Sequence, residues 1–120
     1  MKRELRDIED VQQLIDVFCE RALHDDLSGL AFHQIPDLHS HWKALYAYWS
    51  DAFLTTQLNT TEPALKHEEL KLGHQHFIRW LTLFTETLDS LFEGTAAANA
   101  KITLIKRSEE LQSRLGLLGF

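Results

Sequence analysis

Cysteine is almost absent from this chain, since Cys19 is the only one among 120 residues. A single cysteine cannot form an intrachain disulfide, and it provides neither a set of thiolates for zinc nor a Cys-x-x-Cys-His motif for covalent haem attachment. We therefore expect a protein of a reducing compartment, the cytoplasm, in which any haem would be held non-covalently.

The chain also lacks a long hydrophobic run and a cluster of positive charge. Its longest strictly apolar run, ALYAYW at residues 44–49, is far shorter than the roughly 20 residues that a membrane-spanning helix requires. The first ten residues, MKRELRDIED, have no apolar core of the kind found in a secretory signal. The net charge is -6, and no basic stretch is longer than Lys106-Arg107. Neither a membrane nor a nucleic acid is expected as a partner.

What the chain does contain is typical of one globular domain. Apolar residues make up 44% and charged residues 25% of the sequence, as in ordinary folded proteins. A chain of 120 residues can bury one hydrophobic core but is short for two. We expect a single domain that spans residues 1–120.

Apolar residues recur at spacings of three and four, which predicts an all-α fold. Four helices are expected, at residues 8–23, 37–53, 74–92 and 95–115. Asp37 and Thr95 are suitable N-caps for the second and fourth helices, and Gly116 would end the fourth. The apolar pattern begins at Ile8 in the first helix and includes Ile102 and Ile105 in the fourth. The stretch KITLIK is rich in β-branched residues, but its alanine-rich approach and the following SEELQSRL favour a helix.

Two long connections, at residues 24–36 and 55–73, separate these helices. Connections of this length in a small domain are usually functional or mobile, and at most a short helix fits at residues 63–69. His67 lies in the second connection, within PALKHEEL. The local pattern alone favours an ordinary solvated histidine there.

Seven histidines raise the question of a metal site. The two His-x-His pairs, at 39/41 and 74/76, lie on expected helices, where residues i and i+2 point about 200° apart and cannot chelate one ion. No glutamate is followed by a histidine at the third position, as a di-iron carboxylate site would require. No Gly-x-Ser-x-Gly motif is present, and Cys19 lies in mid-helix beside an apolar stripe, which favours a small buried side chain over a reactive thiol.

One histidine lies among apolar and aromatic residues. His41, Leu45 and Tyr48 are spaced at i, i+4 and i+7, so they share one helix face. Haem needs one firm axial ligand and a dry slot with apolar and aromatic walls. This arrangement is therefore compatible with a haem pocket.

Four stretches together resemble a known family. They are VFCERALHDDLSGLAFHQ at residues 17–34, HWKALYAYWSDAFL at 41–54, ALKHEELKL at 64–72 and HQHFIRWLTLFTETLDSLFEG at 74–94. The residues that carry the likeness, in order, are Phe32, His41, Trp49, His67, His76, Phe77 and the run RWLTLF at 79–84. In sequence and order these stretches are similar to the group III truncated haemoglobins, which are small globins with a two-over-two helical sandwich around haem.

The resemblance implies roles for particular residues. It makes His67 the proximal ligand of a haem b iron and Phe32 the loop aromatic that stacks on the porphyrin. His41 would be the distal histidine, with Leu45 on the same face, and Trp80 the indole that donates to a bound ligand. The other residues implied to contact the cofactor are Tyr48, Leu70 and Phe77, together with Lys66 or Arg79 as partners of a haem propionate.

One position departs from the family pattern. Members usually carry Phe-Tyr where this chain has Phe18-Cys19, so the tyrosine hydroxyl that bonds to iron-bound oxygen is missing. A thiol is a weaker donor, and Trp80 and His41 would have to supply the polarity of the distal pocket.

The resemblance implies binding of O2, CO and NO, in nitric oxide detoxification, peroxidase-like redox chemistry or gas sensing, with a reductase as partner. Two alternatives stay open, a haem-free helical interaction module and a histidine-rich metal-binding protein.

Overall fold

The computed structural model describes residues 2–26, 29, 33, 37–54 and 74–114, with the backbone alone at 74, 77 and 111–114. Its four helices are α1 (Ile8–His24), α3 (Leu38–Leu54), α5 (His74–Leu91) and α6 (Thr95–Arg114). Within these ranges the only β-type pairing is an isolated bridge between Arg3 and Phe92. The predicted all-α fold class is therefore confirmed, and the KITLIK stretch is helical. The predicted helix at 63–69 and the predicted end of the fourth helix lie outside the described residues.

Capping side chains fix where the first two helices begin. The Asp7 carboxylate accepts a hydrogen bond from the backbone N–H of Asp10 at 3.0 Å, which caps α1. Asp37 accepts from the backbone N–H of Ser40 at 3.2 Å, as predicted for the start of α3. Hydrogen bonds from the Ser40 side chain and backbone lower the pKa of the Asp37 carboxyl below its ordinary value, because they favour its charged form.

The turn between α5 and α6 depends on a glycine. Gly94 has a φ of +95°, and a Cβ there would lie 2.8 Å from the Glu4 side chain. The Gly94 carbonyl accepts from Ala98 N–H at 3.0 Å, so Thr95 is the first residue of α6 and not its N-cap as predicted. Glycine adopts this backbone conformation without strain, so Gly94 allows the short turn between the end of α5 and the start of α6.

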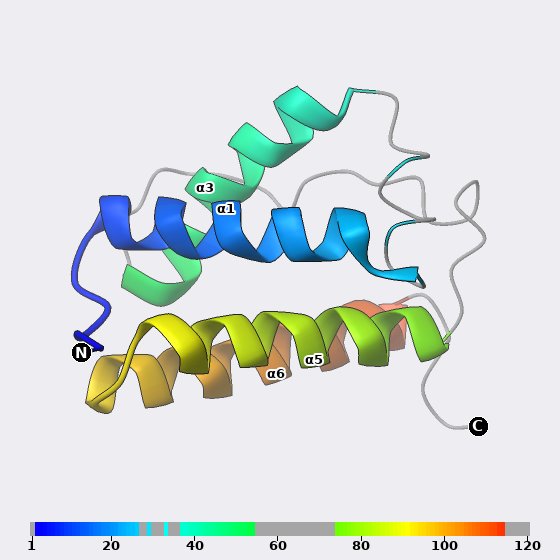
Figure 1. The fold of residues 1–120 in the computed structure, drawn as a ribbon. Coiled ribbons are helices and arrows are strands. Elements are labelled where there is room, and N and C mark those ends of the chain that lie inside the picture. The colour runs from blue at the N-terminus through cyan, green and yellow to red at the C-terminus, as the bar shows by residue number, and fades with distance from the viewer. Residues whose placement is uncertain (1, 27–28, 30–32, 34–36, 55–73, 115–120) are drawn as a thin grey trace.

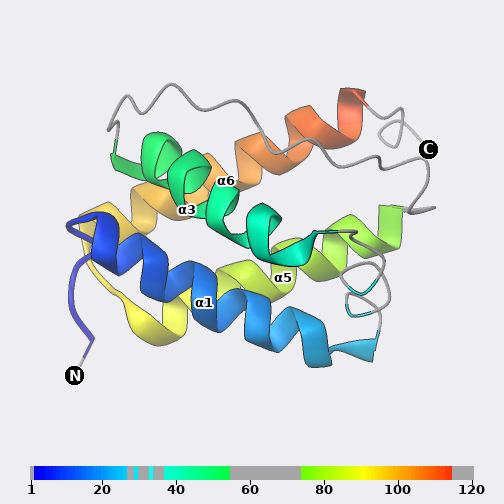
Figure 2. The same ribbon diagram turned by 90° about the horizontal axis from the view of Figure 1, so that it is seen from above.

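The four helices form two layers. α1 packs on α3 and on α5, while α6 packs on α5 and α3. Figure 1 shows α1 and α3 in the upper layer and α5 and α6 in the lower one, and Figure 2 shows the same layers from above. Among the helices in the described ranges, none combines the length and the apolar character needed to cross a membrane.

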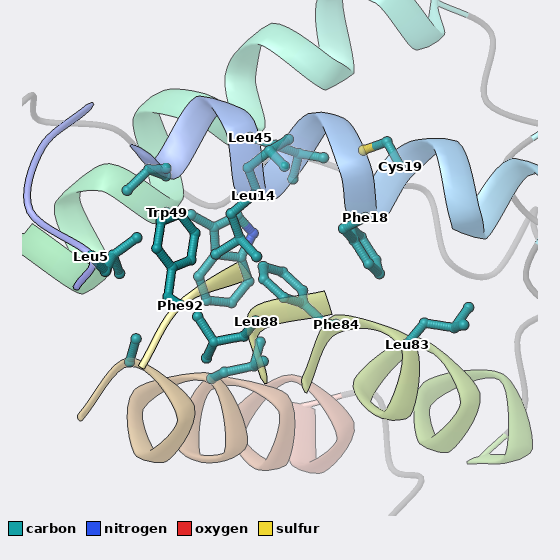
Figure 3. Packing of buried hydrophobic residues seen from close by; sticks show 14 of the residues in the cluster. Leu5, Leu14, Phe18, Cys19, Leu45, Trp49, Leu83, Phe84, Leu88 and Phe92 are labelled. Carbon is teal, nitrogen blue, oxygen red and sulfur yellow. The ribbon is translucent and has the colours of Figure 1, made fainter. Parts of the chain in front are cut away.

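The core lies between the two layers and is rich in aromatic side chains (Figure 3). Phe18, Phe84, Leu14 and Leu88 are almost completely shielded from solvent. Among its described side chains, α6 contributes two alanines and one leucine to this core, namely Ala97, Ala100 and Leu104.

Three isoleucines do not join this core, contrary to the predicted apolar stripes. Ile8, Ile102 and Ile105 are exposed, and Ile102 retains 53% of its accessible surface. The buried face of α6 passes through the small Ala100 and through Leu104. Ile102 and Ile105 therefore lie on the outer side of α6.

Candidate functional site

An aromatic cluster joins α1, α3 and α5 at the centre of the candidate site. The Phe18 ring of α1 stacks on Phe84 with centroids 4.5 Å apart and meets Trp80 edge to face at 5.9 Å. Trp49 of α3 lies 6.0 Å from Trp80 and 5.1 Å from Phe84. Offset and edge-to-face contacts of this kind are favourable beyond the burial of their area. The cluster therefore fixes how three helices that carry predicted site residues meet.

Cys19 is completely buried, and the prediction that its side chain faces the interior is confirmed. Figure 3 shows its sulfur directed toward the side of the core where Leu45 lies. Burial raises the pKa of the Cys19 thiol far above its ordinary range, and the negative charges of Asp16 and Glu20 add to the shift. The thiol thus stays protonated at neutral pH, which suits neither a nucleophile nor a thiolate metal ligand.

The predicted distal face of α3 runs from half-buried to buried. His41 is half-buried near the start of the helix, where its backbone N–H donates to Asp37 at 3.0 Å. Leu45 and Tyr48 retain only 8% and 9% of their accessible surface. A half-buried histidine is thus followed by two buried side chains along the same face of α3.

Tyr48 faces aromatic and cationic neighbours. Its ring meets Trp49 edge to face at 4.9 Å, and the Arg107 guanidinium of α6 lies 5.8 Å from the ring centroid. A cation at this distance is attracted to the face of the ring. Tyr48 therefore helps to hold α3 against α6.

Trp80 is half-buried and contacts all three neighbouring aromatic rings, including Phe84 on its own helix at 5.5 Å. Its contact with Phe18 places it near the Phe18-Cys19 pair of α1. The structure thus brings Trp80 into contact with Phe18, the residue before Cys19, although the two are about 60 residues apart in the chain.

Arg79 has a partner that the sequence did not indicate. Its Nε donates to Asp25 Oδ1 at 2.8 Å, and a terminal guanidinium nitrogen lies 2.6 Å from the same oxygen. The hydrogen bond to Asp25 raises the pKa of Arg79 above its ordinary value. The pair ties the start of α5 to the end of α1, so a propionate partner for Arg79 would have to share its guanidinium with Asp25.

Several predicted site residues lie outside the part of the chain that the structure describes. They are Phe32, Lys66, His67 and Leu70, together with the side chain of Phe77. Their predicted roles stay predictions. In the described ranges, no three His, Cys, Asp or Glu side chains are grouped so that they could hold a metal ion.

A polar cluster at the α1–α3 interface was not predicted. Asp16 Oδ1 accepts from the Trp42 indole Nε1 at 2.9 Å and also from the Tyr46 hydroxyl. Burial, followed by the hydrogen bond to Asp16, raises the pKa of the Tyr46 phenol to about 12. The usable sequence signal was the i, i+4 spacing of Trp42 and Tyr46, which puts two donors on one helix face. Their acceptor lies 26 and 30 residues away, and no local pattern indicates it.

Comparisons with known proteins add no relative. No family model matches the chain, and no curated protein and no solved structure matches it significantly. The resemblance to the group III truncated haemoglobins therefore depends on the residues quoted above.

Proposed function

We propose that this chain is a haem-binding globin of the truncated, two-over-two type, which binds small diatomic ligands. In this proposal His67 is the proximal ligand of the iron, and His41, Leu45, Cys19 and Trp80 surround the ligand on the other side. The observation that carries the proposal is the contact between Phe18 and Trp80 at 5.9 Å, because it joins the two helices that bear Cys19 and Trp80.

The arrangement of the helices supports this proposal. α1 and α3 form one layer and α5 and α6 the other, and each layer contacts the other through α1 on α5 and α3 on α6. A two-over-two globin needs this pairing, with its distal residues on the first three helices. The packing is compatible with that requirement.

The described residues also fit the chemical needs of a haem pocket. Leu45 and Tyr48 are shielded from solvent and belong to the same hydrophobic core as Trp49, which Tyr48 contacts. Side chains of this kind would exclude water from a bound ligand. The neutral Cys19 thiol would not compete for the iron, because ligation by sulfur requires a thiolate.

When bound, haem supplies an iron whose sixth coordination position accepts O2, CO or NO. The chain's own residues would then determine how the ligand is held. In this proposal the half-buried His41 would donate a hydrogen bond to the ligand or control its entry, and the Trp80 indole would be a second donor. The thiol of Cys19 is a weak donor, so oxygen would be held less firmly than by a tyrosine at that position.

The experiment is a titration of the purified chain with haemin, followed by absorbance. We expect stoichiometric uptake with a strong Soret band, which His67→Ala abolishes. His74→Ala is the matched control, since it removes another imidazole and should leave the band unchanged. Absence of a Soret band in the wild-type protein after haemin addition, or an equal band in His67→Ala, would contradict the proposal.

The ferric spectrum tests the distal histidine separately. If His41 binds the iron at rest, the spectrum should be low-spin and become high-spin in His41→Ala. A high-spin wild-type spectrum would limit His41 to donating or gating.

A further inference from the structure

Asp16, Trp42 and Tyr46 form a hydrogen-bonded group that the proposed haem site does not use. The Asp16 carboxylate is on the exposed side of α1, and one of its oxygens accepts from both the indole N–H and the phenolic O–H of α3. Both donors are half-buried. A phenol that is hydrogen-bonded to a carboxylate has a ready acceptor for its proton.

Aromatic side chains connect this group with the interior. Trp42, Tyr46 and Trp49 are spaced at i, i+4 and i+7, so they follow one face of α3 at intervals of one turn, with Cβ atoms about 5–6 Å apart. Trp49 in turn lies 6.0 Å from Trp80 of α5. Indole and phenol rings are among the protein groups most readily oxidised by one electron. Rings one helical turn apart are near enough for one to reduce the other.

We propose that Tyr46, paired with Asp16, is a redox-active tyrosine that receives oxidising equivalents from the Trp49–Trp80 pair. A one-electron oxidant of high potential, such as a ruthenium(III) polypyridine complex, takes an electron from these indoles and is reduced, and Tyr46 then gives one electron to the oxidised indole. The phenolic O–H bond breaks and its proton forms a new O–H bond on Asp16. The products are a neutral tyrosyl radical, a protonated Asp16 and the reduced oxidant.

The site is reset by a small one-electron reductant such as ascorbate, which reaches the exposed side of α1. The electron reduces the Tyr46 radical, and Asp16 returns the proton. Oxidised indoles in the core would thus be reduced again before they react further. This activity needs no haem, although a peroxide-oxidised haem is one oxidant that could feed it.

The second tyrosine of the chain is the natural comparison. The Tyr48 ring faces the Arg107 guanidinium at 5.8 Å, and a nearby positive charge makes removal of an electron from the ring harder. Tyr46 faces a carboxylate instead. Because the chain has only these two tyrosines, a tyrosyl signal can be assigned by two substitutions.

The test uses a ruthenium polypyridine photo-oxidant attached to the full chain through an Ile78→Cys substitution. Ile78 is 46% exposed on α5, the helix that carries Trp80, whereas Cys19 is buried and stays unlabelled. After a light flash with an electron acceptor, the sample is frozen for electron paramagnetic resonance. We expect a tyrosyl signal in the labelled parent and in Tyr48→Phe, and its loss in Tyr46→Phe.

Two further variants separate proton and electron transfer. Asp16→Asn keeps the side-chain size but removes the proton acceptor, so the tyrosyl yield should fall several-fold. In the labelled parent, tyrosyl formation should be slower in D2O than in H2O, because a proton moves in the same step. Trp49→Phe keeps an aromatic ring and should slow tyrosyl formation several-fold. Circular dichroism confirms that each variant is folded. A tyrosyl signal that persists in Tyr46→Phe, or an unchanged yield in Asp16→Asn, would overturn the proposal.

Discussion

Replacing Cys19 by tyrosine tests whether this position of α1 lies beside the proposed ligand. The Cys19 side chain is completely buried. Because the core around it is already filled, the larger phenol ring should destabilise the fold by about 1–3 kcal/mol. In the haem-loaded protein the added hydroxyl would donate to bound oxygen, and such a hydrogen bond typically contributes about 1 kcal/mol. A difference of this size corresponds to roughly fivefold slower dissociation of oxygen.

Cys19→Phe is the matched control, because it adds the same ring without the hydroxyl. We expect both variants to lose similar stability in urea unfolding followed by tryptophan fluorescence. In a stopped-flow experiment in which CO displaces bound oxygen, the tyrosine variant should release oxygen more slowly than the phenylalanine variant. Equal oxygen dissociation rates in these two variants would refute the placement of position 19 beside the ligand.

Three further predictions concern the described fold. Phe84→Ala should lower the free energy of unfolding in urea by about 3–5 kcal/mol, because the ring is fully buried, whereas exposed Ile102→Ala should change it little. Gly94→Ala should lower the thermal midpoint, because a positive φ and a Cβ contact of 2.8 Å with Glu4 both oppose it; an unchanged midpoint would argue against this turn. The phenol pKa of Tyr46 is raised to about 12 by burial and a carboxylate, so its contribution to stability should be complete below the ordinary value of 10 and be lost as the pH rises through 12. Alkaline unfolding curves of Tyr46→Phe should lack this loss, and curves identical to wild type would contradict it.

The helices were predictable because their signals are local. The i, i+3 and i+4 apolar spacing and the Asp37 cap lie within single segments, and the observed α3 begins one residue after Asp37. The buried face of α6 was less predictable. Ile102 and Ile105 carry the stronger hydrophobic signal, but α6 packs on α5 and α3 with the smaller Ala97 and Ala100 buried. Which apolar residue is buried depended on the partner helices.

The contacts at the candidate site were predictable only in part. That Cys19 faces inward follows from its place beside an apolar stripe. The pairing of Arg79 with Asp25 does not follow, because the two side chains are separated by 54 residues and meet only when α5 packs on α1. The acceptor role of Asp16 has the same cause, since it requires α1 and α3 to be in contact. Ion pairs and hydrogen bonds between helices thus depend on how the helices pack, and the spacing of residues in the sequence does not predict them.

Asp16 also explains why Tyr46 of α3 does not supply the hydroxyl that is missing at position 19. The Tyr46 phenol lies across the α1–α3 interface, and Asp16, one turn before Cys19, is close enough to raise the pKa of both the phenol and the thiol. However, the Tyr46 hydroxyl donates to Asp16 on the exposed side of α1, and a phenol has only one proton to donate. The same carboxylate that prepares Tyr46 for oxidation therefore keeps its hydroxyl away from the buried side of Cys19. A strong hydrogen-bond donor beside the proposed ligand would then have to come from position 19 itself, from His41 or from Trp80.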